Sequence, residues 1–407
     1  MHVRLLACKD QQVLAREMRE IRVSERGIEL MLPKAEHLVM RVYGVRHTAA
    51  NILKQTLLSN GGDAAVSYHC CLGGEAQTDV LLFATARQFR AACERLKEQA
   101  FGLAGLVEQI EVLLDRNTRA PQPLKTKNAD FIWGSRTYIM GIVNITPDSF
   151  SKDGLAASEN PAESAARQAM RFQAEGADII DVGGESTRPG HAPVSADTEK
   201  ERILPAIRAI KDAVDLPVSV DTFKAEVAQA ALEAGADWIN DIWGLQFDPG
   251  MAAVAAQYHA PVVLMHNQEG TAYQSLMGDI IAFLAKSIAI AEKAGVPKEH
   301  IMVDPGIGFG KTADQNLEVL KYLADLKTLG YPILVGTSRK SLIGKVLQLP
   351  EDHRVEGTAA TVALAIANGA DIVRVHDVAQ MTLVSRMADA VVRRDYQTRL
   401  SDAMKIQ

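Results

Sequence analysis

The sequence predicts an α/β protein, in which a (β/α)8 TIM barrel is preceded by a small N-terminal α+β domain. The chain has 407 residues, which is enough for a barrel of about 250 residues together with one smaller domain. Hydrophobic residues make up 47% of it and charged residues 23%, as in ordinary globular proteins. From residue 137 onward, apolar β-branched runs alternate with amphipathic stretches, a pattern typical of parallel strands covered by helices.

The N-terminal domain is predicted to cover residues 1–115. Its apolar runs are short and alternate with helical patterns, which favours an α+β arrangement. Nothing in it carries recognisable chemistry, so it could be a scaffold, a partner surface or an oligomer surface. Strands are expected at residues 37–45, 64–71 and 80–84, and helices at residues 10–21, 47–59 and in two segments within 86–114.

All four cysteines lie in the first quarter of the chain, at Cys8, Cys70, Cys71 and Cys93. Because His69 precedes the adjacent pair Cys70 and Cys71, these three residues could suggest a metal site. Zinc sites, however, usually space their cysteines as Cys-x-x-Cys. Buried structural thiols are therefore the favoured interpretation.

A polar, basic stretch with prolines at 121 and 123 predicts a linker over residues 116–135. The barrel then covers residues 136–395, and residues 396–407 form a C-terminal tail. Eight strand candidates favour a barrel, although a doubly wound open sheet is the alternative. The strands are expected at 138–144, 178–183, 217–221, 237–242, 261–266, 301–305, 332–337 and 371–376, and helices at 161–175, 197–214, 224–234, 278–294, 314–329 and 357–367.

The charge balance argues against two classes of partner. Lys and Arg number 44 and Asp and Glu 50, which gives a net charge of -6. General binders of nucleic acid or of anionic membranes are normally basic, so neither partner is expected. No apolar run approaches the roughly 18 residues of a membrane span, and the N-terminus becomes charged too early for a secretory signal. We therefore expect a cytoplasmic protein.

Nearly every predicted barrel strand ends at a polar or charged side chain. The carboxyl ends of the strands in such a barrel share one rim, where active sites are built. Any single one of these residues could instead cap a helix or face solvent. The strand ends are Asn144, Asp181, Asp221, Asn240 with Asp241, His266, Asp304, Ser338, and Arg374 with His376.

Two groups of these residues suggest a chemistry. Asp221, Asn240 and Asp304 would accept hydrogen bonds from a planar heterocycle that presents N–H groups, with direct metal binding by the carboxylates as the alternative. On an acidic protein, a cationic group indicates an anionic substrate such as a phosphate, unless its members are scattered surface cations. This second group comprises Arg188, Arg339, Lys340, Arg374 and His376.

The motifs at these positions resemble those of the dihydropteroate synthase family. The most specific strings are Asn-Ile-Thr-Pro-Asp-Ser-Phe at 144–150 and Gly-Gly-Glu-Ser-Thr-Arg-Pro-Gly at 183–190. The resemblance covers about residues 136–395 and leaves out the N-terminal domain. Further motifs of the family begin at Ser219, Asn240, Met265, Asp304, Ser338 and Arg374.

The resemblance implies a transferase of folate biosynthesis. It would condense 6-hydroxymethyl-7,8-dihydropterin diphosphate with 4-aminobenzoate to give 7,8-dihydropteroate and pyrophosphate. The resemblance also implies Mg2+ as the cofactor, with Asn144 as a metal ligand, and a homodimer. The partners would thus be small-molecule substrates and a second copy of the chain.

By similarity, rim residues are assigned to each substrate, and some of them are shared. Asp221, Asn240, Asp304, Lys340 and Arg374 would hold the pterin, and Asn144, Arg374 and His376 the diphosphate. The aminobenzoate site would be formed by Phe150, Thr187, Arg188, Pro189, Phe309, Lys340 and Ser341. The catalytic residues would be Asp148, Asp153, Lys340, Arg374 and His376.

One departure from the family leaves a role open. The first loop usually reads Ser-Phe-Ser-Asp-Gly-Gly, whereas residues 149–154 read Ser-Phe-Ser-Lys-Asp-Gly. Either Asp148 or Asp153 could therefore be the catalytic loop carboxylate. Two other functions are alternatives: a pterin-binding methyltransferase acting on a reduced folate and a corrinoid protein, or a non-catalytic pterin-binding protein. The methyltransferase needs no diphosphate clamp, so the cationic residues argue against it.

Overall fold

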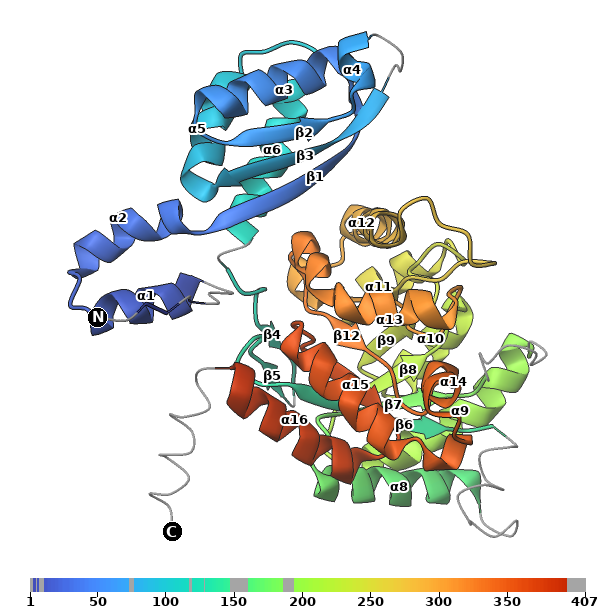
Figure 1. Ribbon diagram of the computed structural model, residues 1–407. Coiled ribbons are helices and arrows are strands. Elements are labelled where there is room, and N and C mark those ends of the chain that lie inside the picture. Colours follow the sequence, from blue (N-terminus) through green and yellow to red (C-terminus); the bar gives the residue numbers. More distant parts are fainter. Residues whose placement is uncertain are drawn as a thin grey trace. The chain divides into compact units, whose positions relative to one another are not determined.

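A computed structural model describes residues 3–4, 6, 11–72, 77–116, 119–127, 129–146, 160–185 and 194–393. The chain divides into two compact units, Met1–Arg119 and Ala120–Gln407. Each unit is described by itself below (Figure 1). Among the described residues, no helix is long and apolar enough to cross a membrane.

The N-terminal unit contains a three-stranded antiparallel sheet in the order β1-β3-β2. Its side chains alternate between the two faces, so that Val80, Leu82 and Ala84 of β3 are buried while the residues between them are more exposed. The expected α+β arrangement is confirmed. The strands are β1 (His37–Arg46), β2 (Asp63–Val66) and β3 (Gln77–Thr85), and the helices α1 (Gln11–Glu20), α2 (Glu25–Ala35), α3 (His47–Ser59), α4 (His69–Leu72), α5 (Ala86–Leu96) and α6 (Leu103–Arg116).

One predicted strand of this unit is wrong in its second half. The strand expected at 64–71 ends at Val66, and the short helix α4 starts at His69. The cause is Ser67, whose hydroxyl accepts a hydrogen bond from the His69 N–H while its carbonyl accepts one from the Cys70 N–H. Serine favours such local turns over a continuing strand.

Two of the cysteines, Cys70 and Cys93, are described in full and are free, buried thiols. Burial raises the pKa of Cys93 to about 11, so that this thiol stays protonated and inert. Among the residues that the structure describes, no group of three or more His, Cys, Asp or Glu side chains could hold a metal ion. The burial of Cys70 and Cys93 agrees with structural thiols.

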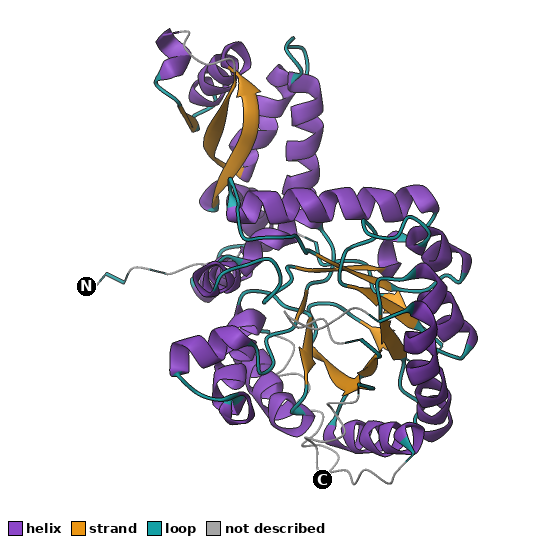
Figure 2. Ribbon diagram, turned by 90° about the vertical axis from the view of Figure 1, so that its right-hand side faces the viewer, coloured by secondary structure: helices purple, strands orange, loops and turns teal. Residues whose placement is uncertain are grey.

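The second unit is built on eight parallel strands in the order β11-β10-β9-β8-β7-β6-β13-β12. A parallel bridge between Val303 and Ile333 joins the two ends of this series, which closes the barrel (Figure 2). The predicted TIM barrel is confirmed. Its strands are β6 (Tyr138–Asn144), β7 (Ile179–Gly183), β8 (Val218–Asp221), β9 (Trp238–Asp241), β10 (Val262–Met265), β11 (Ile301–Asp304), β12 (Leu334–Val335) and β13 (Ile372–Val375).

Helices surround this barrel and bury one apolar face each against the outside of the strands (Figure 2). The sequence sets their ends: α8 begins with an Asn160 cap and Pro161 and stops at Gly176, whose φ of 97° suits glycine. The helices are α8 (Pro161–Glu175), α9 (Ala196–Ala213), α10 (Ala225–Glu233), α11 (Met251–Gln257), α12 (Leu276–Ala294), α13 (Ala313–Lys321), α14 (Ser341–Leu347), α15 (Val355–Ala367) and α16 (Val378–Val392), with short 3-10 turns at Lys298–His300, Leu323–Leu329 and Glu351–His353.

The segment expected to be a linker, 116–135, instead contributes to the barrel. It contains a two-stranded hairpin of β4 (Leu124–Lys125) and β5 (Asp130–Phe131). Leu124, Phe131 and Trp133 are buried in one cluster with residues from the starts of the barrel strands, and the Phe131 ring centre lies 5.1 Å from that of Trp238. The hairpin therefore closes the amino-terminal end of the barrel interior. The tail predicted at 396–407 lies outside the described residues.

Candidate active site

The registers of the parallel strands bring the polar strand ends to one level. Asn144 pairs with Gly183, Gly183 with Asp221, and Asp221 with Asn240. Because Gly183 has no side chain, Asn144 and Asp221 approach each other over it: a methyl group there would lie 3.6 Å from both Asn144 Oδ1 and Asp221 Cβ. Two strands beyond β9 in the barrel, β11 also ends at a polar residue, Asp304.

Arg374 of β13 crosses this rim and binds residues of two other strands. Its Nε donates to Asp181 Oδ2 and its Nη2 to Asp221 Oδ2, each at 2.5 Å. Asn240 Nδ2 also donates to Asp181 Oδ2, at 3.3 Å. All four side chains are largely or fully buried. The network thus connects β7, β8, β9 and β13 at the carboxyl ends of the strands.

Two carboxyls of the rim, Asp221 and Asp304, have a raised pKa, and burial is the main cause. Burial raises the pKa of Asp221 to about 7, a rise that the charge of Arg374 opposes and that of Asp181 increases. Burial likewise raises the pKa of Asp304 to about 6, although the Gly306 N–H donates to Oδ1 at 2.7 Å. The positive charges of Lys340 and Arg374 lower the pKa of both acids, so these four groups lie within electrostatic reach of one another. Such perturbed carboxyls are typical of ligand-binding sites.

Lys340 lies over the loop that follows β11. Its Nζ is 4.1 Å from the centre of the Phe309 ring, a cation–π contact. A methyl group added to Gly308 would lie 3.0 Å from Lys340 Cδ, so the lysine stem rests on this glycine, whose φ is 86°. The helix α14 begins directly after Lys340 with an exposed Ser341, as the sequence indicated.

The remaining cations of the rim have specific partners. His376 Nδ1 lies 2.9 Å from Ser338 Oγ, which fixes the imidazole beside the end of β12. Arg339 is bound by Asp377 through two hydrogen bonds, of 3.1 and 2.5 Å. Arg339 therefore serves an ion pair within the β12–β13 region, and the anion-binding role considered for it is not supported by this geometry.

The structure thus brings together Asn144, Asp221, Asn240, Asp304, Phe309, Lys340, Ser341, Arg374 and His376 along the carboxyl ends of the strands and the loops that follow them. The other predicted site residues, Asp148, Phe150, Asp153, Thr187, Arg188 and Pro189, lie outside the described residues.

Sequence reasoning gave no role to two groups that build this site. Asp181 is fully buried and holds both Arg374 and Asn240, but the sequence placed it only among the polar strand ends, without a substrate or partner. Lys311 is buried beside His266, with Nζ 3.0 Å from Nδ1. A lysine in a glycine-rich loop gives no such signal, because its partner lies 45 residues away.

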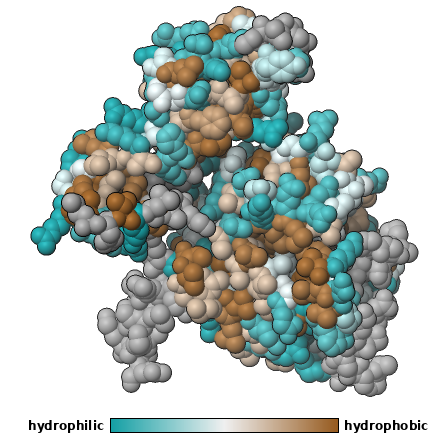
Figure 3. Space-filling model, in the orientation of Figure 1, coloured by the Kyte–Doolittle hydropathy of each residue, from teal (hydrophilic) through white to brown (hydrophobic). Residues whose placement is uncertain are grey.

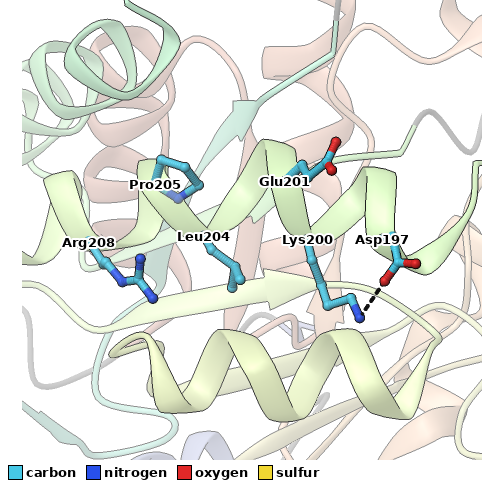
Figure 4. A pocket seen from close by; sticks show the side chains of 6 residues that line it. All are labelled: Asp197, Lys200, Glu201, Leu204, Pro205 and Arg208. Atoms are coloured by element: carbon cyan, nitrogen blue, oxygen red, sulfur yellow. Dashed lines mark ion pairs between the residues drawn. The ribbon is translucent and has the colours of Figure 1, made fainter.

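A further hollow lies on the outer face of α9, between Asp197 and Arg208 (Figure 4). Its wall is formed by side chains of a single helix, including the ion pair of Lys200 with Asp197 at 2.8 Å. An exposed ion pair between neighbouring turns is an ordinary helix surface. The rim of the barrel remains the candidate site.

Known proteins resemble this chain over the barrel. Residues 140–376 match the family described as pterin binding enzyme. A dihydropteroate synthase from Clostridium beijerinckii is 53% identical over 67% of this chain and 100% of its own length. The crystal structure of a dihydropteroate synthase from Clostridium difficile, obtained in the presence of pteroic acid, has a TM-score of 0.63 at 52% identity and covers 65% of this chain and 100% of that one. One from Xanthomonas albilineans, with 4-aminobenzoic acid, has a TM-score of 0.63 at 40% identity, over 67% and 98% of the two chains.

A closed (β/α)8 barrel with this rim and this match belongs to the pterin-binding enzymes, and the chain is a member of that family. Its relatives there are dihydropteroate synthases, which are transferases. The resemblance seen in the sequence is confirmed, as is the expectation of a transferase.

One group of relatives also resembles the N-terminal unit. A probable bifunctional folylpolyglutamate synthase/dihydropteroate synthase from Halobacterium salinarum is 42% identical over 90% of this chain and 44% of its own length. A match of that extent necessarily includes much of Met1–Arg119. The N-terminal unit is therefore shared with another protein that contains this barrel.

Proposed function

We propose that this chain condenses 6-hydroxymethyl-7,8-dihydropterin diphosphate with 4-aminobenzoate to give 7,8-dihydropteroate and pyrophosphate. The observation that carries the proposal is the buried network of Asp181, Asp221, Asn240 and Arg374, with Asp304 at the end of another strand of the same rim, in a chain that belongs to the pterin-binding enzymes. These groups match the hydrogen-bonding edge of a pterin.

The pterin ring is held by acceptors at the floor of the site. Two carboxyls, Asp221 and Asp304, face a ring edge that carries N–H donors, and the Asn240 amide can both donate and accept. Ring N–H groups that bind to these carboxyls favour their ionised form and offset the burial that raises their pKa. Arg374, already held by Asp181 and Asp221, packs beside the ring, and Lys340 closes the opposite side.

The diphosphate is held by Asn144, Arg374 and His376. Positive and N–H-bearing groups preorganised at the leaving group stabilise the charge that develops on pyrophosphate. His376 is oriented for this by Ser338. The arylamine nitrogen forms the new C–N bond as the C–O bond to the diphosphate breaks, and the amine loses a proton. No covalent bond to the protein is needed.

Mg2+ fits this arrangement through Asn144. Magnesium prefers oxygen ligands and commonly takes few from the protein when substrate phosphates supply others. The Asn144 Oδ1 would be such a ligand, and the described residues offer no cluster of three acidic or imidazole groups that would bind the ion alone. When bound, Mg2+ would neutralise charge on the departing pyrophosphate.

Aminobenzoate approaches from the side of Phe309 and Lys340. The Phe309 ring supplies an apolar wall, and the Lys340 ammonium above it attracts the carboxylate. The first backbone N–H groups of α14, at Ser341, add partial positive charge there. Phe150, Thr187, Arg188 and Pro189 complete this pocket in the proposal, and Asp148 or Asp153 provides a loop carboxylate.

The proposal includes a homodimer formed through α15 and α16. Leu364 of α15 and Leu383, Met387 and Val391 of α16 are each between 58% and 73% exposed. Apolar surface is visible over these two adjacent helices (Figure 3). A contiguous apolar patch on a water-soluble unit is typical of an oligomer interface. Sedimentation of the purified chain would test this part separately.

The test of the function is pyrophosphate release by the purified protein with Mg2+ and both substrates, measured in a coupled assay. The proposal expects one pyrophosphate for each dihydropteroate formed, and none when either substrate is left out. Release of pyrophosphate without aminobenzoate, or no product with both substrates, would contradict it.

A further inference from the structure

The loop 305–312 encloses a buried lysine that the proposed mechanism does not use. Lys311 is 9% exposed. Its Nζ lies 3.0 Å from three acceptors: Nδ1 of His266, the carbonyl oxygen of Gly306 and the carbonyl oxygen of Phe309. An ammonium group has three N–H donors, so this set satisfies all of them.

The protonation of the pair is consistent with that arrangement. Burial and the charge of Lys311 lower the pKa of His266 to about 3, so its ring is neutral and Nδ1 can accept a hydrogen bond. Burial lowers the pKa of Lys311 to about 7, against the attraction of Asp304. Whether the Lys311 amine is charged or neutral, it keeps at least two N–H groups, one for each of the two carbonyls.

The two carbonyls belong to a glycine-rich loop, which is also held by the Gly308 N–H donating to Asn316 Oδ1 and by the Tyr273 hydroxyl donating to the Gly310 carbonyl. Gly306, Gly308 and Gly310 all have positive φ, between 55° and 86°. The Gly306 backbone lies so close to His266 that a methyl group there would be 2.0 Å from the His266 carbonyl oxygen. Such a run of left-handed glycines loses much conformational freedom on folding, so bonds across it decide its shape.

The side chain that this loop presents is Phe309. The Phe309 N–H donates to the Gly306 carbonyl and closes a turn there. Because Lys311 donates to both the Gly306 and the Phe309 carbonyls, it fixes the backbone from which the Phe309 ring extends. The ring in turn lies 4.1 Å below Lys340 Nζ. Lys311 is therefore linked to the predicted aminobenzoate wall without lying in it.

We propose that Lys311 is a positioning residue for the second substrate, which sets the Phe309 ring and the Lys340 ammonium for the arylamine by clamping the Gly306 and Phe309 carbonyls. This inference rests on the proposed function. Its effect should fall more heavily on aminobenzoate than on the pterin, because the pterin is held not only by Asp304 and Lys340 but also by Asp221 and Asn240, which lie on other strands with bonds of their own.

The test compares Lys311→Met with the wild type. Methionine keeps the length of the buried chain and removes its donors. We expect the KM for aminobenzoate to rise about tenfold, as the loss of one or two hydrogen bonds allows. The Kd of 6-hydroxymethylpterin, measured by calorimetry without the second substrate, should change less than about twofold. The matched control is Lys211→Met, which removes a half-buried ion pair with Asp237 at the amino-terminal end of the strands and should alter neither constant.

Each outcome decides one of the two proposals. If the wild-type protein forms no dihydropteroate, the proposed function fails. If it does, and Lys311→Met keeps a normal KM for aminobenzoate or loses affinity for both substrates alike, the positioning role is wrong. Should Lys311→Met not fold, Lys311→Gln, which stays polar in the same place but cannot reach both carbonyls, must show the same one-sided rise in KM.

Discussion

Arg374 Nε lies 2.5 Å from Oδ2 of Asp181, a carboxylate with no exposed surface. This contact holds the guanidinium at the centre of the rim, where it also binds Asp221. A buried ion pair of this kind contributes little net stability, but the removal of one partner leaves the other charge uncompensated. Asp181 therefore acts on substrate through Arg374.

Asp181→Asn should lower kcat/KM about 10- to 100-fold, because a neutral amide no longer fixes the buried guanidinium. Steady-state kinetics measure the effect. Asp178→Asn is the matched control, since Asp178 binds Arg136 in a similar pair near the start of the same strand. Equal losses of kcat/KM in the two variants would show a general loss of stability and not a role at the rim.

Asp304→Asn should weaken pterin binding by about 1–3 kcal/mol, because the ring loses a charged acceptor. Calorimetric titration with a pterin gives this value directly. Asp325→Asn is a suitable comparison, since Asp325 is an acid of the Leu323–Leu329 turn away from the rim. An unchanged Kd in Asp304→Asn would remove Asp304 from the ring-binding set.

Asp304 should also make the ligand-free protein less stable as the pH rises. Its pKa is about 6 in the folded state against 3.8 for an ordinary aspartate, so the folded state binds more protons between these values. The free energy of unfolding contributed by this group therefore falls as the pH rises from about 4 to about 6 and is level above that. Thermal melts of wild type and Asp304→Asn across this range measure it, and a stability difference between the two that does not vary with pH would contradict it.

Phe131→Ala should lower the free energy of unfolding by about 3–5 kcal/mol, because it empties a buried site at the closed end of the barrel. Urea denaturation measures this loss. The neighbouring Ile132→Ala is the control: Ile132 is 54% exposed and should have little effect. If both variants unfold at the same urea concentration, the hairpin does not close the core as described.

The barrel could be predicted because its strands are continuous apolar runs that end in polar side chains. Asp221, Asn240 and Asp304 were recognisable since each follows such a run. The β4–β5 hairpin could not, because strands of two residues carry no periodicity and each has a single apolar side chain, Leu124 in β4 and Phe131 in β5. The sequence of residues 120–135 is therefore typical of a linker.

Reasoning from the sequence could not identify contacts between residues that lie far apart in the chain. Asp181 and Arg374 are 193 positions apart, and only the closure of the barrel brings them into contact. The pair of Lys311 and His266 depends on the exact path of a glycine-rich loop, which local sequence does not determine. Residue types at strand ends indicate which side chains share a rim, whereas their mutual bonds follow from the closed fold.

The most direct test of the rim as a pterin site is a crystal structure of the protein soaked with a pterin. The account predicts the ring on the floor of the rim, with its N–H edge within hydrogen-bonding distance of Asp221 and Asp304 and with Asn240 and Arg374 beside it. A ring bound anywhere else, with these four side chains still bonded only to their present protein partners, would contradict it.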